Sequence, residues 1–119
     1  MITEDYCSEE IGLLLKEKGF RPPCADKTMY RFIGEGKIYA HVTHQMACKW
    51  LREEHKIHIQ VLCPVVDVDS DEYGVKYNVV ISNLNDHCLA FDTPLEDVEY
   101  DSYEEGVEAA IKYCLVYLV

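Results

Sequence analysis

The residues best suited to chemistry lie near the middle of the chain. Two His-x-x-His pairs, His41 with His44 and His55 with His58, flank Cys48. On a helix, His44, Cys48 and His55 fall on one stripe, as a metal site or a reactive thiol would require. Because Cys48 and His55 would be separated by about 10 Å along the axis, at most His44 and Cys48 can share a zinc ion, with two further ligands from elsewhere.

Cys48 also lies early in that predicted helix, where the helix dipole lowers a thiol pKa, and His44 precedes it by one turn. A cysteine nucleophile is one hypothesis for this pair, but no neighbouring motif completes a catalytic arrangement. The sequence has no phosphate-binding glycine loop and no serine nucleophile elbow. We therefore expect no catalytic residue, no bound metal and no cofactor. A thiol- or metal-dependent enzyme using His44 and Cys48 is an alternative.

A second candidate site is a run of alternating carboxylates. Asp67, Asp69 and Asp71 resemble the opening of a calcium-binding loop. The match then fails, because Glu72 stands where such a loop needs glycine and Asn78 where it needs a bidentate glutamate. We interpret the run as an acidic hairpin tip, with weak divalent-cation binding as the alternative.

Negative charge is concentrated in the second half of the chain. Residues 1–66 hold nine acidic and nine basic side chains, whereas residues 67–108 hold thirteen acidic and one basic, and the whole chain carries −11. Such a surface repels phosphates and attracts cationic patches, so we expect no direct nucleic-acid binding and a protein partner with a basic surface. The expected acidic binding surface comprises Asp67, Asp69, Asp71, Glu72, Glu96, Asp97 and Glu99. Solubility alone is the competing explanation of the charge.

Three amphipathic helices must position these residues. They are predicted at about 8–18, 43–55 and 102–117, and their N-caps are Ser8, Thr43 and Ser102. Gly19 is expected to end the first helix in the left-handed conformation, and Trp50 to anchor the second in the core.

The C-terminal helix has the strongest pattern. Its apolar residues recur on one stripe that must be buried: Tyr103, Val107, Ala110, Ile111, Cys114, Leu115 and Leu118. On its polar flank, Glu108 and Lys112 are expected to pair at i,i+4. Leu13 and Val116 fall outside the apolar stripes of their helices, so they are expected to be exposed and leave both a monomer and a homodimer open.

Between the second and third helices the apolar period changes to two. Alternation predicts an antiparallel meander of strands at 57–62, 75–82 and 87–91, with one polar face. Residues 30–33 and 37–41 form a possible further hairpin, which gives three to five strands. The prediction is a single α+β domain over residues 1–119, with the helices packed mainly on one face of the sheet.

The six cysteines are well separated and include no Cys-x-x-Cys motif. The chain begins without a secretory signal pattern and has no apolar run of the roughly 20 residues that span a bilayer. We therefore expect a cytoplasmic protein with free thiols and no membrane contact, with a disulfide or a metal site as alternatives.

Three stretches are familiar in combination: residues 1–8 continuing through 14–20, Thr43–Glu54 and Asp101–Leu115. Together they resemble a family of small uncharacterised proteins encoded in gut Bacteroidales genomes and in their phages and mobile elements. The resemblance implies a bacterial or phage cytoplasm, and it implies no activity, cofactor or catalytic residue.

These observations favour a non-catalytic accessory module that binds another protein through its sheet face or its acidic half. The alternative is an acidic nucleic-acid mimic that inhibits a DNA-binding protein, because thirteen acidic residues face one basic residue over 67–108. Such a mimic would bind its basic partner with an affinity that falls steeply as salt rises.

Overall fold

The computed structural model describes residues 6–20, 30–33, 37–62, 76–87, 89–91 and 93–119. Its elements are α1 (Glu9–Glu17), β1 (Tyr30–Ile33), β2 (Lys37–Ala40), α2 (His44–His55), β3 (Ile57–Leu62), β4 (Asn78–Asn83), β5 (Leu89–Ala90), η2 (Pro94–Asp97), α3 (Tyr103–Tyr113) and η3 (Cys114–Leu118). Three helices and an antiparallel three-stranded sheet confirm the α+β prediction.

The helices begin where their caps predict. Each N-cap oxygen accepts a hydrogen bond from a backbone N–H three residues on: Ser8 from Ile11, Thr43 from Met46 and Ser102 from Glu105. Helix α1 ends at Glu17, and Gly19 follows the C-cap residue Lys18 with φ 92°. The N–H of Phe20 donates to the Leu15 carbonyl. This left-handed ending, which glycine adopts without strain, folds Phe20 back into the core.

The C-terminal helix differs from its prediction. The α-helix ends at Tyr113 and continues as one turn of π-helix, η3, rather than as α-helix to residue 117. Cys114 and Leu115 remain fully buried in this wider turn, while Tyr117 is 71% exposed. Nothing in the local sequence explains the widening.

The predicted meander is confirmed as β3–β4–β5, with β3 at one edge and β4 in the middle. Strand β3 has the predicted bounds, whereas β4 and β5 are shorter than expected. Tyr77 forms an isolated bridge with Tyr100 instead of extending β4, and His87 lies in a turn with φ 52°, which confines β5 to two residues. The hairpin of β1 and β2 also forms, as a separate two-stranded sheet.

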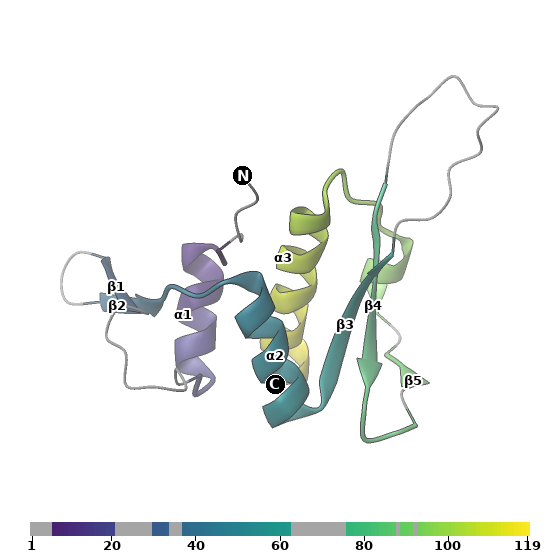
Figure 1. Cartoon of the computed structure of the whole chain (residues 1–119), viewed down its shortest axis with the longest axis horizontal. Coiled ribbons are helices and arrows are strands. Elements are labelled where there is room, and N and C mark those ends of the chain that lie inside the picture. Colours follow the sequence, from purple (N-terminus) through teal and green to yellow (C-terminus); the bar gives the residue numbers. More distant parts are fainter. Residues whose placement is uncertain (1–5, 21–29, 34–36, 63–75, 88, 92) are drawn as a thin grey trace.

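The helices lie on one side of the three-stranded sheet, as predicted (Figure 1). Helices α2 and α3 pack on the sheet, whereas α1 packs on α3 and on β2. Gly106 allows α3 to approach β4 closely, because a Cβ there would lie 3.2 Å from Val79 Cγ1. Helix α3 is therefore the central element, in contact with α1, α2 and the sheet.

The core lies between these layers and includes Ile11, Leu15, Leu51, Ile111 and Leu115, each at most 1% exposed. Two core assignments from the sequence need correction. Trp50 is only half-buried and packs edge-on against Phe20, and Tyr103, expected inside, is 51% exposed because the first turn of α3 borders an open cleft. Leu13 and Val116 are exposed, as predicted. None of the described helices has the length and apolarity that crossing a membrane requires.

Candidate functional site

The segment before α1 is held against the segment before α2. Tyr6 forms an antiparallel bridge with Thr43, and its ring stacks on His41 with the ring centroids 4.2 Å apart. The N–H of Cys7 donates to the Val42 carbonyl at 2.8 Å. These contacts hold Cys7 beside the first turn of α2.

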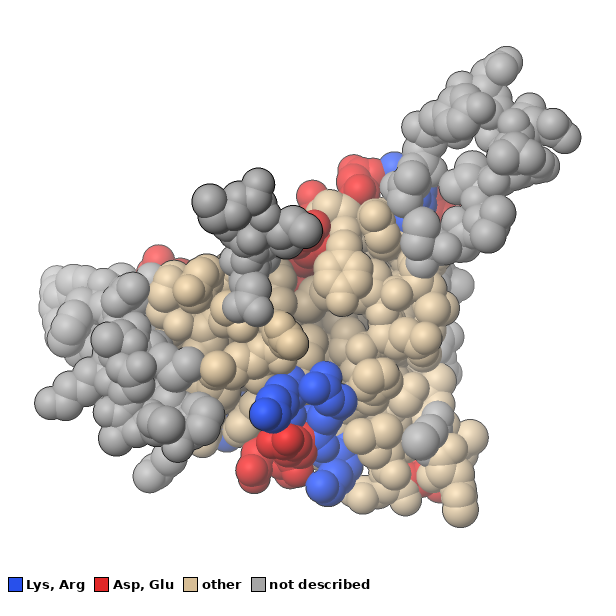
Figure 2. All heavy atoms as spheres, in the orientation of Figure 1, with Lys and Arg blue, Asp and Glu red and all other residues tan. Residues whose placement is uncertain are grey.

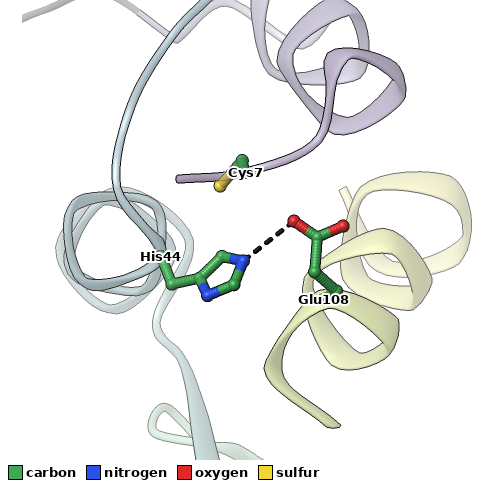
Figure 3. Close-up of side chains that lie close together, drawn as sticks. All are labelled: Cys7, His44 and Glu108. Atoms are coloured by element: carbon green, nitrogen blue, oxygen red, sulfur yellow. Dashed lines mark hydrogen bonds and ion pairs between the residues drawn. The ribbon is translucent and has the colours of Figure 1, made fainter. Parts of the chain in front are cut away.

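Three side chains from distant parts of the chain, Cys7, His44 and Glu108, lie close together (Figure 3). We call these three residues the cluster. His44 is the first residue of α2, and its Nε2–H donates to Glu108 Oε1 of α3 at 2.8 Å. The nearest ligand atoms of the three side chains all lie within 4.8 Å of one another. Within the described residues, no other group of three or more His, Cys, Asp or Glu side chains converges in this way.

The cluster is largely shielded from water. Cys7 is 5% and His44 9% exposed, and the Glu108 side chain is 28% exposed. Glu108 Oε1 also accepts a hydrogen bond from the Ser8 N–H at 2.8 Å, so one carboxylate oxygen joins α1 and α2 to α3. Burial raises the pKa of the Cys7 thiol to about 12, and the Glu108 charge adds to this, so the thiol is neutral at physiological pH.

Beside the cluster lies an open cleft of about 460 Å³, bounded by α2, β3 and the start of α3. Its walls are Thr43, His44, Gln45, Cys48 and Arg52 of the α2 region, His58 and Ile59 of β3, and Tyr103, Glu104 and Val107 of α3. Figure 2 shows this face as mostly uncharged, with basic and acidic atoms side by side over the lower part of α2 and further acidic atoms over the start of α3.

Two charged residues in the walls of this cleft have no ion-pair partner among the described residues. Arg52 makes no ion pair with any residue in the described ranges, and Glu104 is exposed and likewise makes none there. The edge of β3 also borders the cleft, and no described strand pairs with that edge. The cleft thus combines an edge strand of the described sheet with one basic and one acidic side chain.

The four histidines of the sequence analysis do not form one site. His41 stacks on Tyr6, His44 joins the cluster, His55 packs edge-on against Trp50, and His58 lines the cleft. Cys48 lies in the cleft wall near His44, but it does not belong to the cluster.

Cys48 is also not activated. Burial raises the pKa of its thiol, and nearby Arg52 opposes this only in part. An activated nucleophile needs the opposite shift, because the thiolate is the reactive form. The physical basis for an enzyme that uses His44 and Cys48 is therefore weak.

The predicted acidic surface is largely outside the described part of the chain. Asp67, Asp69, Asp71 and Glu72 lie in residues that the structure does not describe. Glu96 and Asp97 belong to η2, and the orientation of their side chains is not described, while Glu99 is exposed. Whether these seven residues form one surface stays a prediction. Nearby, Lys76 forms an ion pair with Asp101.

Sequence reasoning missed two members of the cluster. Cys7 was treated as one of several separated thiols, and Glu108 was assigned to Lys112. Lys112 instead pairs with Glu10 of α1, with its Nζ 2.9 Å from Glu10 Oε1. One signal was available, because Glu108 follows the buried Val107 and precedes Ile111 by three residues, which places it beside the apolar stripe.

Cys7, Cys48 and Cys114 are free thiols, as expected, while the other three cysteines lie outside the described residues. Comparison of the chain with protein families, with curated proteins and with solved structures finds no match in any of the three. The resemblance to the Bacteroidales family therefore stays a prediction.

Proposed function

We propose that this protein is a non-catalytic binding module that holds an extended segment of a partner protein in the cleft between α2, β3 and the start of α3. The observation that carries the proposal is the position of β3, an edge strand among the described strands, along an open cleft. In an antiparallel ladder, alternate residues of an edge strand direct N–H and C=O groups away from the sheet. An added strand satisfies these groups, and peptide-binding domains use this mode of recognition.

The walls of the cleft favour a peptide over a flat protein surface. Its volume of about 460 Å³ admits a few side chains and lies within the range of ligand pockets. Ile59 and Val107 supply apolar contact, and His44 and His58 supply hydrogen-bonding groups. A short stretch of backbone with one or two anchoring side chains fits this combination.

Charge specifies the partner segment further. Arg52 in the α2 wall of the cleft favours an acidic side chain, and Glu104 in the α3 wall favours a basic one. The net charge of −11 steers a partner with a basic surface toward this protein over a distance of about a Debye length. The partner we propose is therefore a basic protein with an extended segment of mixed charge.

The setting we propose is the cytoplasm of a bacterium or a phage-infected bacterium, with the protein acting as an accessory factor. Support comes from the described thiols, which are all free as expected in a reducing compartment. The resemblance of three stretches of the sequence to the Bacteroidales family points the same way.

The test starts from a displayed library of random short peptides, selected on the purified protein. Selected peptides are titrated into isotope-labelled protein, and the backbone amide shifts are followed by NMR. We expect the largest shifts in β3 and α2. Arg52→Glu should weaken binding at least tenfold, whereas Lys49→Glu, the same charge change on an exposed residue of α2 outside the cleft, should leave it within about twofold.

Two results would overturn the proposal. One is a selected peptide that changes the amide signals of the outer face of the sheet or of the acidic residues and leaves the signals of β3 and α2 unchanged. The other is an affinity that Arg52→Glu and Lys49→Glu lower equally and that falls steeply with salt. That result would favour the nucleic-acid mimic, because it reports net charge rather than a defined cleft.

A further inference from the structure

The cluster brings together three different donor types from three separate segments. Cys7 precedes α1, His44 begins α2, and Glu108 lies in the middle of α3 (Figure 3). Side chains that meet from such distant positions are held by the tertiary fold and not by one helix. A thiol, an imidazole and a carboxylate with all ligand atoms within 4.8 Å are a donor set that suits a divalent transition metal, zinc above all.

The distances between the ligand atoms of the cluster fit a zinc ion after small movements of the side chains. Zinc binds sulfur at about 2.3 Å and nitrogen or oxygen at about 2.0–2.2 Å, so neighbouring ligands of a tetrahedral ion lie about 3.4 Å apart. His44 Nε2 and Glu108 Oε1, at 2.8 Å, must separate by about half an ångström. The 4.8 Å limit on the remaining pairs requires the thiol to move closer by at most about 1.4 Å.

The groups around the cluster hold its donors in place. The Ser8 N–H fixes Glu108 Oε1, and the Thr43 side chain caps the helix turn that carries His44. The Cys7 backbone is tied to Val42. Hydrogen bonds to metal ligands of this kind orient the donors and raise their affinity for the ion.

The geometry points to a zinc site formed by Cys7, His44 and Glu108, with water as the fourth ligand. This site is independent of the proposed peptide binding, although His44 also lines the cleft. When zinc binds, the Cys7 thiol releases its proton to solvent, and the His44 ring carries its proton on Nδ1, so that Nε2 is free to ligate the ion. The thiolate and the carboxylate together then balance the two positive charges of the ion. Without metal, burial keeps the Cys7 thiol protonated, with a pKa of about 12, and the cluster is then a hydrogen bond between His44 and Glu108 beside a neutral thiol.

Cobalt(II) is the probe, because it occupies zinc sites and is visible by absorption. Titration of metal-free protein with Co²⁺ should give a thiolate-to-cobalt charge-transfer band in the near ultraviolet that saturates at one equivalent, and Zn²⁺ should remove it. Cys7→Ser should abolish the band and weaken zinc binding at least about 100-fold. Cys48→Ala, which removes the other thiol near His44, should keep it.

The metal-free Cys7→Ser variant must show the circular dichroism of the wild type, so that loss of the band is not loss of the fold. His44→Ala provides a second measurement, because it removes a ligand while keeping every thiol, and it should lower the zinc affinity by a similar factor. A wild-type protein without the band at stoichiometric Co²⁺ overturns the site. So does a band of unchanged intensity in Cys7→Ser, because it assigns the thiolate to another cysteine.

Discussion

The cluster and the cleft share His44 and differ in almost every other respect. In the cluster, the polar groups of three segments satisfy one another, and little of Cys7 or His44 contacts water. In the cleft, Arg52, Glu104 and the edge of β3 have no partner among the described residues. One helix, α2, therefore supports both a buried contact that stabilises the fold and an exposed surface that is available to a ligand.

The largest expected effect is a difference in stability between substitutions at two neighbouring residues of α2. Leu51 is completely buried, so Leu51→Ala should lower the free energy of unfolding by about 2–5 kcal/mol. Arg52 faces the cleft, so Arg52→Ala should change it by about 0.5 kcal/mol or less. Urea unfolding followed by circular dichroism measures both. A comparable loss of unfolding free energy in Arg52→Ala would show that the cleft wall is needed for stability and is not simply an exposed binding surface.

The folded protein should also lose stability at high pH, because the core contains the buried thiol of Cys114. Burial raises the pKa of the Cys114 thiol from its ordinary 9.0 to about 12. In the unfolded chain this thiol ionises near 9.0, so between these values the unfolded state binds fewer protons and stability falls as pH rises. From about pH 8 to about pH 10 the loss from this thiol is about 1.4 kcal/mol.

Cys114→Ala is the matched control for this pH dependence. The substitution shifts the whole stability curve, but only the slope reports the thiol, because the tyrosines and lysines titrate in both proteins. Urea unfolding at the two pH values should give a smaller decrease in the variant. Parallel curves for the two proteins would show that the buried thiol ionises as easily as an exposed one.

A smaller difference in stability is expected between substitutions of two glutamates of α3. Glu108→Ala removes the acceptor that Ser8 and His44 share, and the partial exposure of Glu108 limits the cost to about 1 kcal/mol. Glu104→Ala, one turn earlier, removes an exposed side chain that borders the cleft and should cost less than about 0.5 kcal/mol. Equal costs, measured by thermal unfolding at neutral pH, would mean that the cluster contributes nothing to stability.

The sequence predicts those features that are encoded locally. Helix starts depend on residues such as Ser8 and Thr43 and on the apolar period that follows them, and strand alternation likewise involves near neighbours. The isolated bridge between Tyr77 and Tyr100 that precedes β4 could not be predicted in this way, because that contact depends on residues far along the chain. Tyr103 was misplaced for a related reason, since periodicity shows the side of a helix but not where its covering layer stops.

The candidate site was less predictable than the fold. A pattern within one segment drew attention to His44 with Cys48, whereas the structure joins His44 to Cys7 and Glu108 across intervals of 37 and 64 residues. No spacing rule covers such intervals. The cleft likewise depends on how β3 leaves α2 and where α3 begins, and both are set by packing rather than by local sequence.

The smallest expected effect concerns Lys112, for which sequence and structure give different partners. Its ammonium lies 2.9 Å from Glu10 Oε1, and the two side chains are 51% and 64% exposed, so Lys112→Ala should cost less than about 0.5 kcal/mol at low salt. A double-mutant cycle decides the partner, because only residues in contact show a coupling energy. Lys112 should couple to Glu10 and not to Glu108, since Glu108 is already held by Ser8 and His44. Coupling to Glu108 instead would restore the i,i+4 pair and would mean that the cluster carboxylate also faces the open side of the molecule.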